Sequence, residues 1–149
     1  MTEKDTMTQL TDRAVYVTWT KDRVRYSDLD PNGHVNNGAI NQFFEDGRVH
    51  FREARMSTGG AGVILAGFVV VRFACVYHAE LGYPGEVEIG TVILRVGNSS
   101  YTLGQGVFAG DTCIATAEVV TVCVDPATKK TKPIEGKLRD ALESSLLKA

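Results

Sequence analysis

The sequence predicts an α+β fold in which a curved, antiparallel, five-stranded sheet wraps around one long central helix, with a short C-terminal helix. One strand-like segment precedes a long amphipathic helix, and four strand-like segments joined by short links follow it. Short links imply that successive strands are antiparallel neighbours. A long helix with an apolar face needs a surface to pack against, and a curved sheet provides that surface.

The first strand is expected within residues 14–26, where larger apolar side chains alternate with threonines and tyrosine. From about Asn37 to Met56, apolar residues recur at intervals of three and four, which predicts a helix of about five turns. Gly47 lies in the middle of its apolar face, where glycine costs about 1 kcal/mol relative to alanine. We therefore expect Gly47 to let the sheet approach closely. Glu45 and Arg48 are three residues apart and can pair across one turn.

The later segments contain two features that bear on packing. The first half of the segment 63–77 is apolar on both faces, which predicts a central strand. One face of the segment 100–108 carries Ser100, Thr102, Gly104 and Gly106, so we expect another part of the protein to pack very close there. The later elements are expected at 63–77, 86–96, 100–108 and 112–124 for the strands and at 134–147 for the C-terminal helix.

Length and composition indicate a single domain. With 149 residues the chain is long enough for a sizeable core, and we expect a flexible tail at 1–13 and one domain at 14–149. A net charge of −2 provides no general attraction for nucleic acid or an anionic membrane, so an anionic ligand needs a local basic cluster. The N-terminus lacks the pattern of a signal peptide, and no apolar run is long enough for a membrane span.

The three cysteines favour a reducing compartment. Cys75, Cys113 and Cys123 are widely spaced, lie in apolar strand-like segments and form no Cys-x-x-Cys pattern. We expect buried free thiols, which suits the cytoplasm.

The candidate site is the segment 26–37, which reads Tyr-Ser-Asp-Leu-Asp-Pro-Asn-Gly-His-Val-Asn-Asn. Gly33 allows a turn that a side chain would block, and the long helix begins at about Asn36 or Asn37, with asparagine as a good cap. The first N–H groups of a helix have no internal partner, so the turn places carboxylates beside unpaired donors. A carbonyl held between them could be polarised and attacked. Alternatively, the aspartates serve only as turn and cap formers.

The order of elements and this segment, followed by Phe-Phe-Glu-Asp-Gly-Arg at 43–48, resemble the hot-dog-fold acyl-CoA thioesterases, in particular the 4-hydroxybenzoyl-CoA thioesterase family. The resemblance extends from Val15 to about Glu135. It implies that Asp30 acts on the thioester, as nucleophile or as general base, and that the backbone N–H of Asn37 polarises the carbonyl. It also implies a homo-oligomer, a dimer or a tetramer, with active sites at the interface.

Substrate contacts are expected from Gly33 and His34 in the loop, and from Ser99, Ser100 and Lys132 near the phosphates of CoA. The basic residues that many relatives carry before the serine of the fourth strand are absent, because this segment reads Gly-Asn-Ser at 97–99. The serines and the lysine could equally be turn formers and a solvated charge. The sequence shows no signature for the acyl group.

Hydrolysis of a thioester needs no metal or organic cofactor, because a thiolate leaves readily once water is activated and the oxyanion is stabilised. His34 and Asp30 alone are too few ligands for a metal site. Three alternatives remain open: a thioesterase acting on acyl-carrier-protein, a hot-dog dehydratase, and a hot-dog module that binds acyl-CoA without catalysis. We expect neither nucleic acid nor a membrane as partner.

Overall fold

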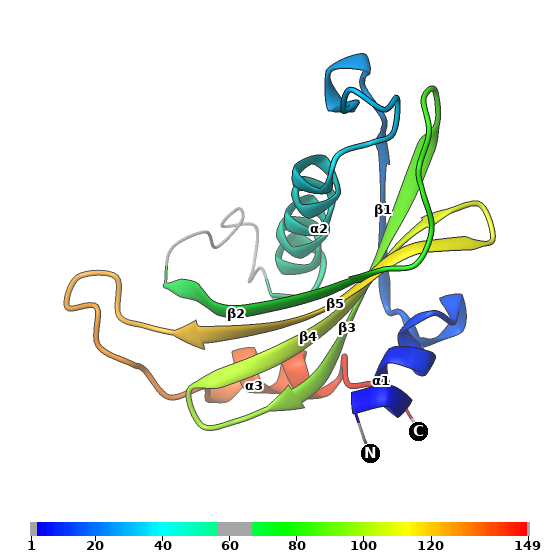
Figure 1. The fold of residues 1–149 in the computed structure, drawn as a ribbon. Helices are drawn as coiled ribbons and strands as arrows, with labels where there is room; N and C mark the ends of the chain where they lie inside the picture. The colour runs from blue at the N-terminus through cyan, green and yellow to red at the C-terminus, as the bar shows by residue number, and fades with distance from the viewer. Residues whose placement is uncertain (1–2, 57–66, 149) are drawn as a thin grey trace.

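The structure, a computed structural model, describes residues 3–56 and 67–148 and contains one antiparallel sheet of five strands. The strand order is β1-β3-β4-β5-β2, so β3, β4 and β5 are neighbours in sequence and in space, as short links require. The curved sheet of Figure 1 confirms the predicted α+β architecture. The strands are β1 (Thr18–Arg23), β2 (Phe68–Tyr77), β3 (Glu86–Val96), β4 (Ser100–Ala109) and β5 (Thr112–Cys123).

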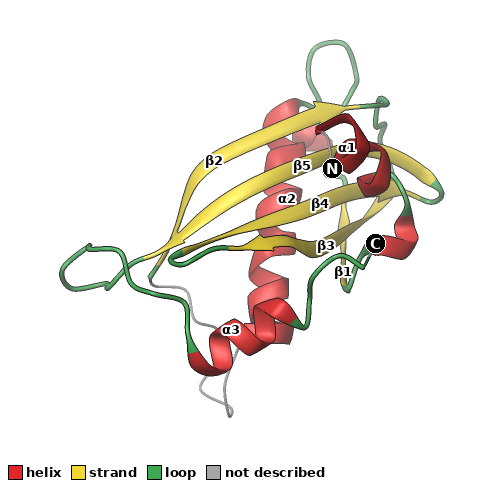
Figure 2. Cartoon of the chain, turned by 90° about the horizontal axis from the view of Figure 1, so that it is seen from below, coloured by secondary structure: helices red, strands yellow, loops and turns green. Residues whose placement is uncertain are grey.

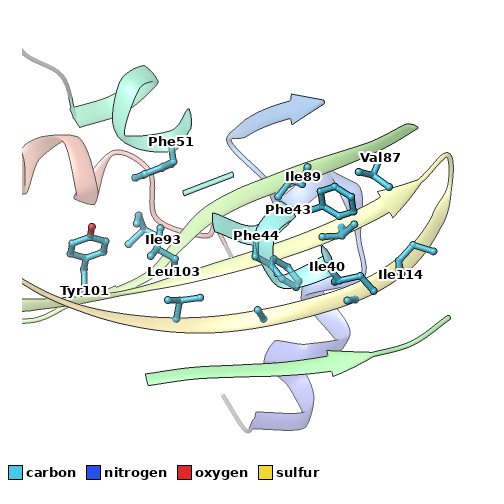
Figure 3. Close-up of a cluster of buried hydrophobic side chains, with 14 of the residues drawn as sticks. Ile40, Phe43, Phe44, Phe51, Val87, Ile89, Ile93, Tyr101, Leu103 and Ile114 are labelled. Carbon is cyan, nitrogen blue, oxygen red and sulfur yellow. The ribbon is translucent and has the colours of Figure 1, made fainter. Parts of the chain in front are cut away.

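Helix α2 (Asn37–Phe51) lies along the concave face of the sheet, where β1 and the β3–β5 strands curve around it (Figure 1). A wider π-helical turn, Arg52–Met56, continues it to the predicted end. Its apolar side chains form the main core together with side chains from the strands (Figure 3). The buried residues of α2 include Ile40, Phe43, Phe44 and Phe51.

Gly47 confirms the predicted close approach of helix and sheet. A Cβ atom at this position would lie 2.5 Å from Cγ2 of Ile89 and 3.0 Å from Nε2 of Gln105. Both neighbours are buried, so a larger residue has no space without displacing the sheet. The absence of a side chain at Gly47 therefore determines how near α2 lies to β3 and β4.

Arg48 forms a buried polar contact with the sheet instead of the expected pair with Glu45. Its Nη1 donates to Oε1 of Gln105 at 3.1 Å, and Gln105 Nε2 donates to the carbonyl of Phe44 at 3.0 Å and to Oγ1 of Thr91 at 3.1 Å. Burial lowers the pKa of the Arg48 guanidinium, and the charge of Glu45 opposes this shift. Among the described residues, no ion pair joins Arg48 to Glu45.

The prediction that residues 63–77 form a central strand was wrong in position. The described part of this segment, β2, lies at one edge of the sheet and pairs only with β5. Residues 63–66 lie outside the described residues. The valines of β2 suggested burial within one chain, yet Val69, Val70 and Val71 are 46%, 40% and 59% exposed. An apolar edge of this kind is a ready surface for a further strand.

The N-terminal segment differs from the expected flexible tail. It forms helix α1 (Glu3–Leu10) and a short 3-10 turn (Arg13–Val15), and α1 lies on the face of the sheet opposite to α2 (Figure 2). Leu10 is fully buried, and its carbonyl accepts a hydrogen bond from the hydroxyl of Tyr16. Apolar burial thus orders a segment whose composition is polar.

Glycines in β3 and β4 make this packing possible. A Cβ on Gly104 would lie 2.7 Å from Cδ2 of Leu10, and one on Gly90 would lie 2.5 Å from Cγ of Tyr16. A Cβ on Gly106 would lie 2.5 Å from the hydroxyl oxygen of Tyr16. The expectation that something packs very close against Gly104 and Gly106 is confirmed.

The C-terminal helix α3 (Gly136–Glu143) is shorter than predicted, because the chain turns at Ser144 and Leu146 then bridges to Ile93 of β3. In the part of the chain that the structure describes, no helix combines the length and the hydropathy needed to cross a bilayer.

Candidate active site

The loop between β1 and α2 folds around Asp30. The backbone N–H of Asp30 donates to the carbonyl of His34 at 2.8 Å, and the N–H of Gly33 donates to the carbonyl of Asp30 at 3.0 Å. Gly33 has a φ of +80°, in the left-handed region that favours glycine. Pro31 fixes its own φ and favours an extended Asp30 before the turn. The loop is therefore closed on itself at both ends of the turn.

The carboxylate of Asp30 divides its two oxygens between two environments. Oδ1 accepts from the backbone N–H of Asn32 at 2.9 Å and from that of His34 at 3.1 Å. No hydrogen bond to Oδ2 exists within residues 3–56 and 67–148. One oxygen thus holds the turn, as the structural interpretation expects, and the other remains available to a ligand or to water.

Helix α2 begins beside this carboxylate. Asn36 is the N-cap, because its Oδ1 accepts from the N–H of Ala39 at 2.7 Å, and Asn37 is the first helical residue. In the described structure the N–H of Asn37 has no hydrogen-bond partner, as expected for the first turn of a helix. The helix dipole adds positive character to this N–H.

A cavity of about 340 Å³ joins these groups. Asp30, His34 and Asn37 line it on one side, and the end of β2 with the following turn lines the other. The N–H of Val35 donates to the carbonyl of Leu81 at 2.9 Å and holds the two sides together. The structure therefore brings together the loop residues that the sequence predicted, with Gly33 in the same turn. The whole lining is Asp30, His34, Val35, Asn37, Ile40, Tyr77, His78, Ala79, Glu80 and Leu81.

The opposite wall of the cavity was not predicted from the sequence. The hydroxyl of Tyr77 donates to Oδ1 of Asn41 at 3.2 Å, and Nε2 of His78 lies 2.9 Å from the hydroxyl of Thr116. Nε2 of His34 lies 3.1 Å from Oε2 of Glu80. These contacts join residues about 40 positions apart, and no sequence motif predicts them. The sequence predicted only that a strand ends at Tyr77.

Ser99, Ser100 and Lys132 form a separate group at the far end of the sheet. The N–H of Cys123 donates to the carbonyl of Ser99 at 2.8 Å, and the carbonyl of Cys123 accepts from the N–H of Lys132 at 2.9 Å. The 11 residues of β3 separate this group from the loop of Asp30, a distance of roughly 30 Å at the rise of a strand. Within one chain, the two predicted parts of the site do not meet.

The thiols carry no sign of reactivity. Cys75, Cys113 and Cys123 are free, and burial raises the pKa of each, to about 11 for Cys113. Burial also raises the pKa of Tyr77 in the cavity wall. Within the described residues, no group of three His, Cys, Asp or Glu side chains is arranged to hold a metal ion.

A five-stranded antiparallel sheet curved around one long helix is the hot-dog fold, and in this chain an acidic loop lies at the start of that helix. The chain belongs to the Thioesterase-like superfamily, whose family profile matches residues 24–142. This confirms the resemblance stated above and the expected enzyme class, a thioester hydrolase.

The chain is similar to the acyl-CoA thioester hydrolase YbgC of Escherichia coli, with 30% identity over 114 residues, 75% of this chain and 85% of the relative. The solved structure of a thioesterase-superfamily protein from Jannaschia superposes on this chain with a TM-score of 0.79 at 27% identity. The match covers 97% of this chain and 94% of the other. A Thermus thermophilus thioesterase complexed with coenzyme A and Zn gives 0.76 at 25% identity, covering 87% and 94%.

Proposed function

We propose that this protein hydrolyses the thioester of an acyl-CoA to a carboxylic acid and free CoA. The observation that carries the proposal is the shared cavity, because Asp30 and Asn37 both line it. Among the described residues, Oδ2 of Asp30 accepts no hydrogen bond and the backbone N–H of Asn37 donates none. The CoA in the Thermus thermophilus complex and the name of the Escherichia coli relative support CoA as carrier. The three unpaired thiols suit a reducing compartment, so we place the reaction in the cytoplasm.

In the proposed reaction the thioester carbonyl oxygen accepts a hydrogen bond from the N–H of Asn37. A donor of this kind stabilises the oxyanion as it develops, and the loss of one costs about 3–4 kcal/mol in other enzymes. Asp30 either removes a proton from the attacking water or attacks the carbonyl carbon itself, giving an anhydride that water then opens. Both routes use the same oxygen of Asp30 and end in the same products.

Hydrolysis of a panel of acyl-CoA esters by the purified protein tests this proposal. We expect turnover of at least one ester, measured as release of free thiol. The panel should vary the acyl chain from short aliphatic to aromatic, because the cavity lining carries both apolar and polar side chains. If no acyl-CoA is turned over and each still binds, the protein is a binding module.

We also propose a homo-oligomer of at least two chains. The exposed apolar edge of β2 offers a surface for a second copy, which would cover its valines. A second chain is also the means by which Ser99, Ser100 and Lys132 could approach the loop of Asp30. We expect light scattering to give at least twice the mass of one chain. A stable monomer at micromolar concentration would contradict this and would leave Lys132 without a substrate to contact.

Lys132→Ala is expected to raise KM for acyl-CoA with little change in kcat. The CoA phosphates lie far from the reacting carbon, so a contact with them stabilises the ground state and the transition state alike. Because Lys132 is exposed, the effect should shrink as salt screens the charge. Lys148→Ala, near the C-terminus, is the matched control. An unchanged KM at low salt would make Lys132 a solvated charge and would favour acyl-carrier-protein as substrate.

A further inference from the structure

The side-chain contact between His34 and Glu80 lies beside the proposed catalytic carboxylate. Nε2 of His34 is 3.1 Å from Oε2 of Glu80, and both residues line the cavity that contains Asp30 and Asn37. The two side chains come from different parts of the chain, the loop before α2 and the turn after β2. Their meeting is therefore a product of the fold and not of local sequence.

His34 is held by the backbone of its own loop, and Glu80 is the neighbour of a residue that joins the two walls of the cavity. His34 exchanges two hydrogen bonds with Asp30, one from its N–H to the carboxylate and one to its carbonyl from the Asp30 N–H. Glu80 precedes Leu81, which is 6% exposed and accepts the hydrogen bond from Val35. The imidazole is thus carried by the same turn that holds Asp30, and its orientation is set by a carboxylate on the facing wall.

The pair contributes little to folding. The side chains of His34 and Glu80 are 46% and 77% exposed, and ion pairs this exposed add little to stability. An imidazole whose ring is oriented by a carboxylate is a recurrent arrangement for proton transfer.

We propose that Glu80 is a positioning residue that holds His34 as the proton donor to the departing sulfur; this rests on the proposed thioesterase activity. With Nε2 engaged by Glu80, Nδ1 is the ring nitrogen without a hydrogen bond among the described contacts. When the tetrahedral intermediate collapses, the C–S bond breaks with its electron pair on sulfur, and the proton on Nδ1 of the imidazolium passes to that sulfur. The carboxylic acid and the free thiol leave, and His34 regains a proton from solvent. In the general-base route Asp30 releases to solvent the proton that it took from the attacking water.

The charged and titratable groups beside His34 come from two parts of the chain. Glu80 faces the ring from the turn after β2, and the carboxylate of Asp30 accepts a hydrogen bond from the backbone N–H of His34 in the loop. His78, which also lines the cavity, lies with its Nε2 beside the hydroxyl of Thr116. Of these groups, Glu80 is the one in contact with the imidazole.

The test compares two esters of one acyl group that differ in the thiol. An alkyl thiol resembles CoA and is the poorer leaving group of the two, whereas an aromatic thiol is more acidic and leaves without a proton. Glu80→Gln and His34→Gln should each lower kcat about 10-fold for the alkyl ester, below the usual 10²–10⁴-fold for acid–base catalysis because a thiolate leaves readily. For the aromatic ester, each loss should fall to about 2-fold or less.

Glu86→Gln is the matched control, since Glu86 is an exposed glutamate near the same turn and does not line this cavity. This variant should leave kcat unchanged for both esters. Equal losses on the two esters in Glu80→Gln, or no loss on either, would overturn the role of Glu80. Asp30→Asn should lower kcat for both esters alike, because Asp30 acts before the C–S bond breaks. If the unmodified protein hydrolyses neither ester, the proposed function fails first, and this result is distinct from a failure of Glu80.

Discussion

Asp30→Asn is expected to lower kcat on a good acyl-CoA substrate by at least about 10²-fold, the lower range for a lost general base. The substitution keeps Oδ1, which accepts the N–H groups of Asn32 and His34, so the turn should persist. It converts the free oxygen, Oδ2, into an amide that neither accepts a proton nor attacks a carbonyl. KM should change little because the amide occupies the same space. Steady-state kinetics together with a melting curve measure both effects.

Asp28→Asn is the control two residues away. The carboxylate of Asp28 accepts the backbone N–H of Arg25 at 2.8 Å and does not line the cavity. An asparagine can make the same hydrogen bond, so activity should fall only slightly. Equal and small losses in the two variants would defeat the proposed chemistry and return Asp30 to a role in the turn. It would also favour the interpretation of the protein as a binding module.

Gln105→Met is expected to destabilise the protein by about 3 kcal/mol, the cost of leaving several buried polar groups without partners. Gln105 is fully buried and is the hydrogen-bond acceptor for Arg48, whose Nε already lacks a partner among the described residues. Methionine has a similar volume, so the loss reflects polarity more than packing. For a chain of this length the melting temperature should fall by about 10 °C. Thermal and urea unfolding provide the measurement.

Two further variants show whether the polar contact is the cause. Gln42→Met makes the same change at an exposed position of α2 and removes only a 3.3 Å hydrogen bond to Asp46, so it should have little effect. Adding Arg48→Met to Gln105→Met removes the unpaired charge as well and should restore part of the stability. If the double variant is less stable than the sum of the single losses predicts, Arg48 has another role.

The elements and the acidic loop could be predicted because their signals are local. The spacing of apolar residues and the asparagine cap predict α2, and the predicted start and end agree with the structure within a residue. Gly33 adopts the left-handed φ that its turn requires, and Asp30 and Asn37 are only seven positions apart, so the chain cannot separate them far. The spacing of apolar residues, the helix caps and the turns depend on residues that are close in the chain, so they can be predicted directly from the sequence.

The position of each strand and the contacts between distant residues were decided by the tertiary structure. Apolar residues on both faces of β2 are equally compatible with a central strand and with an edge that another chain covers, and the valines alone do not distinguish the two. Arg48 pairs with a residue 57 positions away, and Glu80 reaches His34 across a loop. Lys132, which sequence reasoning grouped with Asp30, lies at the opposite end of the sheet. Such contacts depend on which surfaces of the whole chain are buried against one another. A local pattern of residues does not determine this choice.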